Sequence, residues 1–284
     1  MKRTALSIVL QTISCSFLVL LLTTSCTNDE TEQVEKQAEN NISTNGIVFA
    51  GFSQSDTTTR TAIFDHTKNA GASVNWSNDD KIWVKDNTNT WKQSGQVTFP
   101  STTNKSEGMF ALLGAYTKTS HSVVYTNKPI SGTNIQVEIK AEQKQSAPNN
   151  FDHAGVSGDC GVAIAQKSSN GYRFTLSHKA SYLCFIPRSH NSYVNKSKLI
   201  KIEIMSDNNI AGTYKMTEDG DLTYASGGST TITVTTESGF DINDATENMN
   251  KNAVYAVVAP GTHSFRIRYW LRNTEDNPSG PIEG

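Results

Sequence analysis

The chain has 284 residues, with 25 lysines and arginines against 27 aspartates and glutamates, which gives a formal net charge of −2. This length allows one large or two small domains. The near-balanced charge leaves no basic patch, which argues against a nucleic-acid partner.

A secretory signal is predicted for residues 1–25. Lys2 and Arg3 precede an apolar run that ends at Leu22, and small residues follow directly before Cys26. This order is typical of a cleaved signal peptide. The alternative is a transmembrane anchor, but the continuous apolar part is well short of the ~20 residues that a spanning helix needs.

The cysteine directly after the small residues resembles the lipobox of bacterial lipoproteins. In that pattern the signal is cut before the cysteine, and the thiol and the new amino group are acylated. Cys26 is therefore expected to be the lipidated first residue of the mature chain. Several acyl chains, palmitate among them, would anchor the protein stably in the outer membrane. Loss of the signal removes two basic residues and no acidic ones, which leaves 23 against 27.

Residues 26–45 are expected to form a disordered tether, because they have almost no large apolar side chains. The stretch TNDETE directly after Cys26 resembles the surface-export signal of Bacteroidetes lipoproteins. The plain alternative is a solvated acidic linker. In either case the folded part begins at about residue 46.

Short strand-forming runs between Gly, Asn, Asp and Ser clusters follow the tether, which is typical of an all-β sandwich or barrel. The strands predicted first are residues 47–52, 73–76, 81–85, 108–113, 122–125, 135–139, 162–165, 172–176 and 180–186. The last of these is apolar on both faces, which predicts a central strand covered on both sides. Asn170 and Gly171 predict a tight turn between two of the strands.

The composition becomes polar around residues 187–195. We place a boundary there between a first β-domain, residues 46–190, and a second, residues 191–284. The strands predicted for the second domain are residues 199–205, 212–216, 230–235, 253–258 and 264–271, and residues 240–249 are compatible with a short helix.

Cys160 and Cys184 are the cysteines that remain once Cys15 leaves with the signal and Cys26 carries lipid. An extracytoplasmic location permits a disulfide between them. The alternative is two separate thiols, one of them buried in the apolar stretch YLCFI around Cys184. Sequence alone does not fix the geometry that decides between the two.

The chain has no recognised catalytic or metal-binding motif. Ser157 lies in GVSGD, where the nucleophile elbow requires a final glycine, and no strand leading into a helix is evident. His153, Asp159 and Cys160 do not have a known zinc spacing, so a hydrogen-bonded loop is expected. His178 is expected to be structural. We therefore expect no enzyme activity, no metal and no cofactor.

Trp76, Trp83 and Trp91 cluster near the front of the first domain. Exposed aromatic side chains could stack on sugars there, whereas alternating aromatic residues in a sandwich are more often core. Trp83 has Ile82 and Val84 on either side, so at least one face of that strand is expected to be buried.

The order of several short motifs resembles the fimbrillin family of Bacteroidetes, the shaft, tip and anchor subunits of type V pili. After the lipoprotein signal come GIVFAGF, TTTRTAIF, VNWSNDDKIWV, YRFTLSHKASYLCFIP and YAVVAPG, over residues 46–265. The order and spacing of these motifs carry the resemblance. One departure is that the family runs further past the strands at residues 255–271, so the second domain is expected to be short or incomplete.

The resemblance implies two tandem transthyretin-like β-sandwich domains that assemble by strand exchange. An arginine-specific protease removes the lipidated segment with the first strand, and a strand of a neighbouring subunit fills the gap. On this chain the cut falls between Arg60 and Thr61, in a polar stretch suited to nicking; the alternative is an ordinary exposed arginine. The partners implied are other fimbrial subunits, and the location is the outer-membrane surface and the fimbrium.

The chain is thus expected to be a structural pilus subunit that mediates adhesion, with an unidentified host or bacterial surface ligand. The alternative is a surface glycan-binding lipoprotein of a polysaccharide-uptake system, which would keep its lipid and bind sugars through exposed tryptophans. Asp56, Thr57 and Thr58 resemble a Bacteroidetes O-glycosylation sequon with Thr57 as acceptor.

Strand exchange puts a specific demand on the first strand. Residues 47–52 are largely apolar on both faces, which predicts a strand buried in a sheet. The best donor strand within the chain is residues 264–271, where apolar residues alternate with Arg266 and Arg268. The alternative for that segment is an ordinary strand of the second domain.

Overall fold

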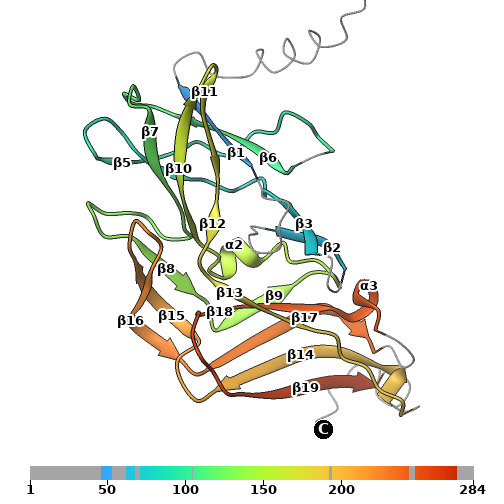
Figure 1. Ribbon diagram of the computed structural model, residues 1–284. Helices are drawn as coiled ribbons and strands as arrows, with labels where there is room; N and C mark the ends of the chain where they lie inside the picture. The colour runs from blue at the N-terminus through green and yellow to red at the C-terminus, as the bar shows by residue number, and fades with distance from the viewer. Residues whose placement is uncertain are drawn as a thin grey trace, which may run out of the picture. The chain divides into compact units, whose positions relative to one another are not determined.

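A computed structural model of the chain describes residues 46–52, 62–67, 71–103, 105–191, 194–242 and 247–273. These residues belong to one unit of the chain, Ile42–Gly284. They fold almost entirely into β-strands (Figure 1), which confirms the expected all-β class. Within these ranges, no helix is both long and apolar enough to cross a membrane.

An eight-stranded sheet is built from the first part of the chain. Its order is β5 (Trp91–Gln93), β4 (Trp83–Lys85), β7 (Ser120–Tyr125), β10 (Gly161–Ser168), β11 (Gly171–Thr175), β1 (Ile47–Phe52) and β6 (Glu107–Leu112), with β12 (Ser177–His178) beside β10. The turn predicted at Asn170 and Gly171 joins β10 to β11, and Gly171 has a φ of 111°. The first predicted strand is β1, inside the sheet between β11 and β6 (Figure 1).

Smaller sheets are formed mainly by the later strands. A four-stranded sheet has the order β19 (Phe265–Asn273), β14 (Ser197–Ser206), β17 (Thr231–Asp241) and β9 (Glu142–Gln145). A three-stranded sheet has the order β16 (Leu222–Ser229), β15 (Ala211–Met216) and β8 (Gln136–Ile139). Two-stranded sheets pair β13 (Ser181–Phe185) with β18 (Val254–Val258) and β2 (Ala62–Thr67) with β3 (Gly71–Asn75). The described helical turns are α2 (Ala154–Ser157), η1 (Val194–Lys196) and α3 (Met249–Asn252).

Strands from both sides of the boundary predicted between residues 190 and 191 pair with one another. β8 pairs antiparallel with β15, β9 pairs parallel with β17, and β13 pairs antiparallel with β18. Three strands that precede residue 190 are therefore hydrogen-bonded to strands that follow it. The division into two domains at this point stays a prediction.

Two hydrophobic clusters form the core. The aromatic cluster gathers buried side chains of β1, β4, β6, β7, β10 and β11, and includes Phe49, Trp76, Phe110, Tyr172 and Phe174. The aliphatic cluster combines side chains from β7, β8, β10, β14, β15, β17 and β18. Strands β7 and β10 contribute side chains to both clusters, because successive residues of a strand point to opposite faces.

β13 is not the covered central strand that its apolar sequence predicts. Among the described strands it pairs only with β18, and its residues are half-buried or, at Cys184, exposed. All five residues of β18 are buried instead. β13 and β18 are paired in the sheet and both have continuous apolar sequences, so both give the signal of a covered strand. The packing around β18 decides which of them is covered, and the sequence does not show that packing.

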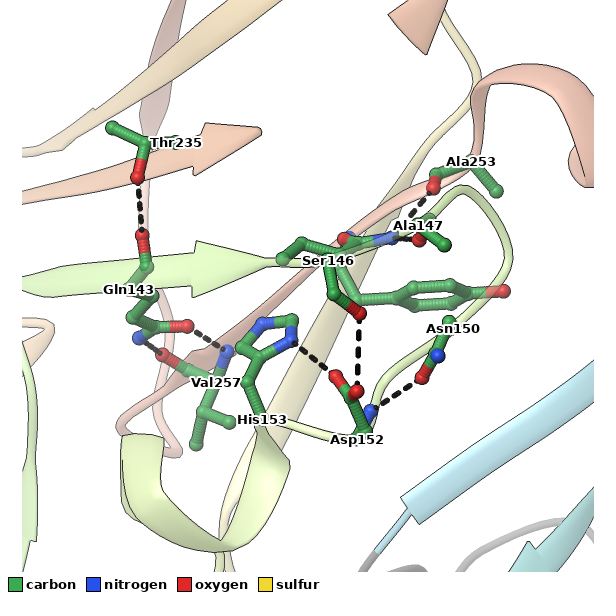
Figure 2. Close-up of polar contacts among 11 residues, drawn as sticks. Gln143, Ser146, Ala147, Asn150, Asp152, His153, Thr235, Ala253 and Val257 are labelled. Atoms are coloured by element: carbon green, nitrogen blue, oxygen red, sulfur yellow. Dashed lines mark hydrogen bonds and ion pairs between the residues drawn. The ribbon is translucent and has the colours of Figure 1, made fainter. Parts of the chain in front are cut away.

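The edge of β18 that faces away from β13 is hydrogen-bonded by side-chain amides. The buried amide of Gln143 on β9 accepts from the Val257 N–H at 2.9 Å and donates to the Val257 carbonyl at 2.7 Å (Figure 2). Gln145 accepts from the Tyr255 N–H at 2.8 Å and donates to the Ala253 carbonyl at 2.9 Å. These amides satisfy backbone groups that would otherwise be buried without partners.

Replacing Gln143 with methionine keeps an unbranched side chain but removes both hydrogen bonds to Val257. We expect the free energy of unfolding to fall by about 2–4 kcal/mol, because each unsatisfied buried polar group costs about 1–3 kcal/mol. Lys144→Met is the matched control on the same strand. It removes only an exposed ion pair with Glu237, which is worth about 1 kcal/mol or less. Equal losses in denaturant titrations of the two variants would contradict the role assigned to the amide.

Candidate functional site

β1 is paired along both of its edges. It runs antiparallel to β6, with Ile47 opposite Leu112, and parallel to β11, with Phe49 opposite Tyr172. Among the described strands, β6 has no ladder partner other than β1. We call the space that β1 fills between β11 and β6 the strand slot.

Phe49 anchors the inner face of β1. Its ring is fully buried, stacks on Tyr172 with ring centroids 4.7 Å apart, and meets Tyr116 edge-on at 5.1 Å. Aromatic pairs of this kind contribute about 0.5–1.5 kcal/mol each beyond the area they bury. On the outer face Phe52 is half-buried, with the Arg173 guanidinium 4.9 Å from its ring. The expectation that this strand is buried in a sheet is confirmed.

Trp76 holds the end of β1. Its indole N–H donates to the Gly51 carbonyl at 3.0 Å, and the side chain is only 3% exposed. Its ring also meets Phe110 of β6 edge-on, with centroids 4.9 Å apart. The sequence leaves Trp76 open between a core role and sugar stacking, and the structure places it in the core.

The residues predicted for lipidation, glycosylation and cleavage lie outside the described residues; they are Cys26, Thr57, Arg60 and Thr61. In sequence, Arg60 and Thr61 fall between the end of β1 at Phe52 and the start of β2 at Ala62. The roles of all four stay predictions.

Cys160 and Cys184 are free thiols in the structure, and the buried one is Cys160, not Cys184. Cys160 belongs to the aliphatic cluster, whereas Cys184 lies on β13 opposite Tyr255. Burial raises the pKa of the Cys160 thiol, which keeps it protonated and unreactive. Of the two alternatives left open by the sequence, the structure has the separate thiols.

Two serines near His153 lack the geometry of nucleophilic catalysis. Ser157 is buried at the C-terminal end of α2 and does not lie at a turn that leads from a strand into a helix. Ser146 donates to Asp152 at 3.0 Å, and His153 Nδ1 lies 3.9 Å from the same carboxylate (Figure 2). In a catalytic triad the histidine lies between the hydroxyl and the carboxylate, whereas here Asp152 lies between them.

Two buried carboxylates, Asp80 and Asp159, are bonded by tyrosine hydroxyls. Tyr125 of β7 donates to Asp80 at 2.7 Å. Asp159 accepts from Tyr182 of β13 and lies 2.7 Å from His178 Nδ1 of β12. Because Asp159 is fully buried, its contacts link β12 and β13 inside the protein. In the ranges that the structure describes, no group of three or more metal-ligating side chains is gathered at one point.

An open cavity of about 440 Å³ lies beside Asp80, and its polar lining includes Asp79, Lys81, Lys128 and Asp152. None of the side chains that line it is a tryptophan. Trp76 and Trp91 are buried in the hydrophobic clusters, and Trp83 is half-buried. Trp76 and Trp91 therefore do not offer an exposed ring for stacking on sugars.

Sequence reasoning missed Gly51 as a contact for Trp76. A signal was present, because an isolated glycine inside the strand pattern IVFAGF indicates a close approach by another part of the chain. What the pattern cannot tell is which side chain approaches.

No protein-family model matches the chain, and a comparison with curated proteins finds no match. Among solved structures, a "putative cell adhesion protein" from Bacteroides ovatus ATCC 8483 is similar with 11% identity and a TM-score of 0.43, over 80% of this chain and 85% of that one. A protein of the same description from Parabacteroides distasonis ATCC 8503 has 10% identity and a TM-score of 0.39, over 80% and 75%. Similarity this low carries no argument about what this chain does.

Protonation of two buried groups should change the stability of the chain in opposite directions. Burial lowers the pKa of His153 from 6.5 to about 4, so the unfolded chain takes up this proton first and stability falls as the pH drops below 6.5. Burial raises the pKa of Asp80 from 3.8 to about 6, so the folded chain keeps this proton longer and stability is lost as the pH rises through 6.

Single substitutions separate the two effects. The free energy of unfolding of His153→Gln minus that of wild type should be about 2 kcal/mol higher at about pH 5 than at about pH 7.5, since 1.36 kcal/mol corresponds to one pKa unit. For Asp80→Asn the same difference from wild type should be about 1 kcal/mol higher at about pH 7.5 than at about pH 5. Denaturant titrations at both pH values measure this, and each variant is the control for the other. Shifts of the same sign in both variants would contradict the assignment.

Proposed function

We propose that the chain is a non-enzymatic structural subunit of a type V-like fimbria that is exported as a lipoprotein through Cys26 and contributes to adhesion. A protease cuts between Arg60 and Thr61 at the outer-membrane surface. β1 then leaves with the lipidated segment, and a strand of a neighbouring subunit enters the strand slot.

The position of β1 is the observation that supports this proposal. β1 is the first described strand, and the predicted cut falls after it and before β2. A cut there frees β1 from the rest of the chain while every later described strand stays intact. The strand that becomes detachable is one that lies inside a sheet, not at its edge.

Loss of β1 has a large cost. It leaves the facing backbone groups of β11 and β6 without partners, and it empties the site of Phe49, where removal of a buried phenylalanine typically costs about 3–5 kcal/mol. Another extended segment can repair both losses, because backbone hydrogen bonds give affinity and alternate side chains give specificity. Head-to-tail filling of this kind builds open filaments.

The alternative function, glycan binding for polysaccharide uptake, receives less support. Trp76 and Trp91 are core residues, so they are not available to stack on a sugar ring. Tryptophan is absent from the lining of the open cavity beside Asp80. We therefore favour the fimbrial subunit.

Cleavage of the purified chain by an arginine-specific protease should release the fragment that ends at Arg60, β1 included, and leave a slot that takes up an added peptide of residues 46–53. Arg60→Lys keeps the charge but removes the cleavage site, so with the same protease this variant should keep β1 and take up no peptide. Treating Arg60→Lys with trypsin should restore both cleavage and peptide uptake. If the cleaved wild-type chain retains β1 and takes up no peptide, or if uncut Arg60→Lys takes up the peptide, the proposed assembly is wrong.

Cys26→Ala should abolish fatty-acid labelling and leave uncleaved precursor, because acylation of the thiol precedes removal of the signal in the pattern that this segment resembles. Metabolic labelling with palmitate, followed by mass spectrometry of the amino terminus, measures both results. Cys15→Ala, inside the signal, is the matched control and should label like wild type. Unchanged labelling of Cys26→Ala would refute lipidation at this position.

A further inference from the structure

Two glycines face each other across the strand slot. Gly51 of β1 pairs with Gly108 of β6 in the antiparallel ladder. A Cβ atom on Gly51 would lie 2.5 Å from Phe174 Cζ and 2.9 Å from Trp76 Cζ2. A Cβ atom on Gly108 would lie 2.7 Å from Trp76 Cδ1. All three distances are shorter than carbon atoms tolerate, so the Trp76 indole occupies space that only two glycines leave open.

The indole of Trp76 cannot easily move aside for a larger residue. Its N–H donates to the Gly51 carbonyl, and its ring makes edge-on contacts with Phe110, Tyr125 and Phe174 at centroid distances of 4.9, 5.9 and 6.2 Å. Displacing it would break contacts to three other elements at once, and overpacking a dense core typically costs about 1–3 kcal/mol.

Two residues earlier on the same face of β1, the slot is shaped for an aromatic ring. Phe49 fits between the ring of Tyr172, on which it stacks, and the edge of Tyr116. His121 contributes a further edge-on contact, with centroids 6.2 Å apart. Since side chains at alternate positions point to one face of a strand, the slot requires an aromatic residue and then a glycine two positions later.

We propose that the strand slot selects a donor strand with the pattern aromatic, any residue, glycine, and that the rings of Phe174 and Trp76 together enforce the glycine. This inference rests on the proposed function and adds the chemical identity of the partner strand. The donor runs parallel to β11 and antiparallel to β6, as β1 does, with its glycine opposite Gly108.

The pattern rules out the donor that the sequence favours within the chain. In β19, the residue two positions after Phe265 is Ile267, and the residue two positions after Tyr269 is Leu271. Neither is the glycine that the pattern requires. A branched side chain at that point would overlap the rings of Phe174 and Trp76. β19 is also paired with β14 along its length, from Phe265 to Asn273. It is an ordinary strand of the four-stranded sheet, which is the alternative that the sequence leaves open.

No segment within residues 53–284 has an aromatic residue followed two positions later by glycine. The strand that we propose for the slot is therefore not one of these residues in a second copy. It is a segment outside this range, supplied by a neighbouring subunit, in which the triplet FAG of β1 has a counterpart.

The first test uses the intact chain and does not depend on cleavage. Gly51→Ala should lower the melting temperature by several degrees, because the added methyl group overlaps Trp76 and Phe174. Gly46→Ala is the matched control, since a Cβ atom there meets its nearest neighbours at an ordinary 3.5 Å, and it should melt like wild type. A Gly51→Ala chain as stable as Gly46→Ala would overturn the glycine requirement.

The second test uses peptides and the chain cleaved at Arg60. A fluorescent peptide of residues 46–53 should enter the vacated slot, as measured by anisotropy, and the same peptide with Gly51→Ala should bind at least about tenfold more weakly, a difference of 1.4 kcal/mol. The peptide with Gly46→Ala should bind like the native one, and a peptide of residues 265–273 should not compete.

The outcomes separate the two proposals. If the Gly51→Ala peptide enters as well as the native peptide, strand replacement stands and the selection rule is wrong. If the cleaved chain keeps its own β1 and takes up no peptide, the proposed assembly fails, and the melting temperatures of the intact variants still decide whether the slot demands glycine.

Discussion

The double pairing of β1 is the constraint on which the eight-stranded sheet depends. Among the described strands, β6 pairs only with β1, while its other edge is hydrogen-bonded to Gly95 and Thr98. Phe49 is fully buried in the aromatic cluster that β6 helps to form. The sheet is therefore incomplete without a strand in this position. The same contacts that stabilise the uncut chain would make a chain without β1 bind another strand.

The fold completes a second strand edge in a different way. β18 is paired with β13 on one side, and Gln143 and Gln145 take the place of a strand on the other. These amides belong to β9, which is held in place by its own pairing with β17. Because the atoms that satisfy β18 come from inside the folded chain, this edge has no need of a partner. Among the described strands, the edges beside β1 face a segment that the predicted cut would release.

The sequence predicts strands best where apolar side chains alternate or cluster, and least well where polar side chains take a buried role. β1 was predicted with its observed bounds. β9, with the sequence EQKQ, was not predicted at all, because nothing in four polar residues shows that two of their amides are buried against β18. β13 was predicted to be central, and the packing that covers β18 in its place depends on contacts distant in sequence. The register that sets Gly51 opposite Gly108 is likewise a property of pairing, which no single strand reveals.

The predicted cut also divides the Trp76 contact in an asymmetric way. Gly51, whose carbonyl accepts the Trp76 hydrogen bond and whose lack of a side chain leaves room for the indole, lies before Arg60 and would leave with β1. Trp76, Gly108 and the rings around them lie after it and would stay. The part of the contact that distinguishes one strand from another thus remains with the body of the subunit, and it remains as a rigid indole held by three neighbouring rings. A preorganised site of this kind loses little conformational entropy when a new strand binds. Its shape also excludes strands with a side chain at the glycine position, because that side chain would overlap the rings, and such steric exclusion gives specificity against similar strands.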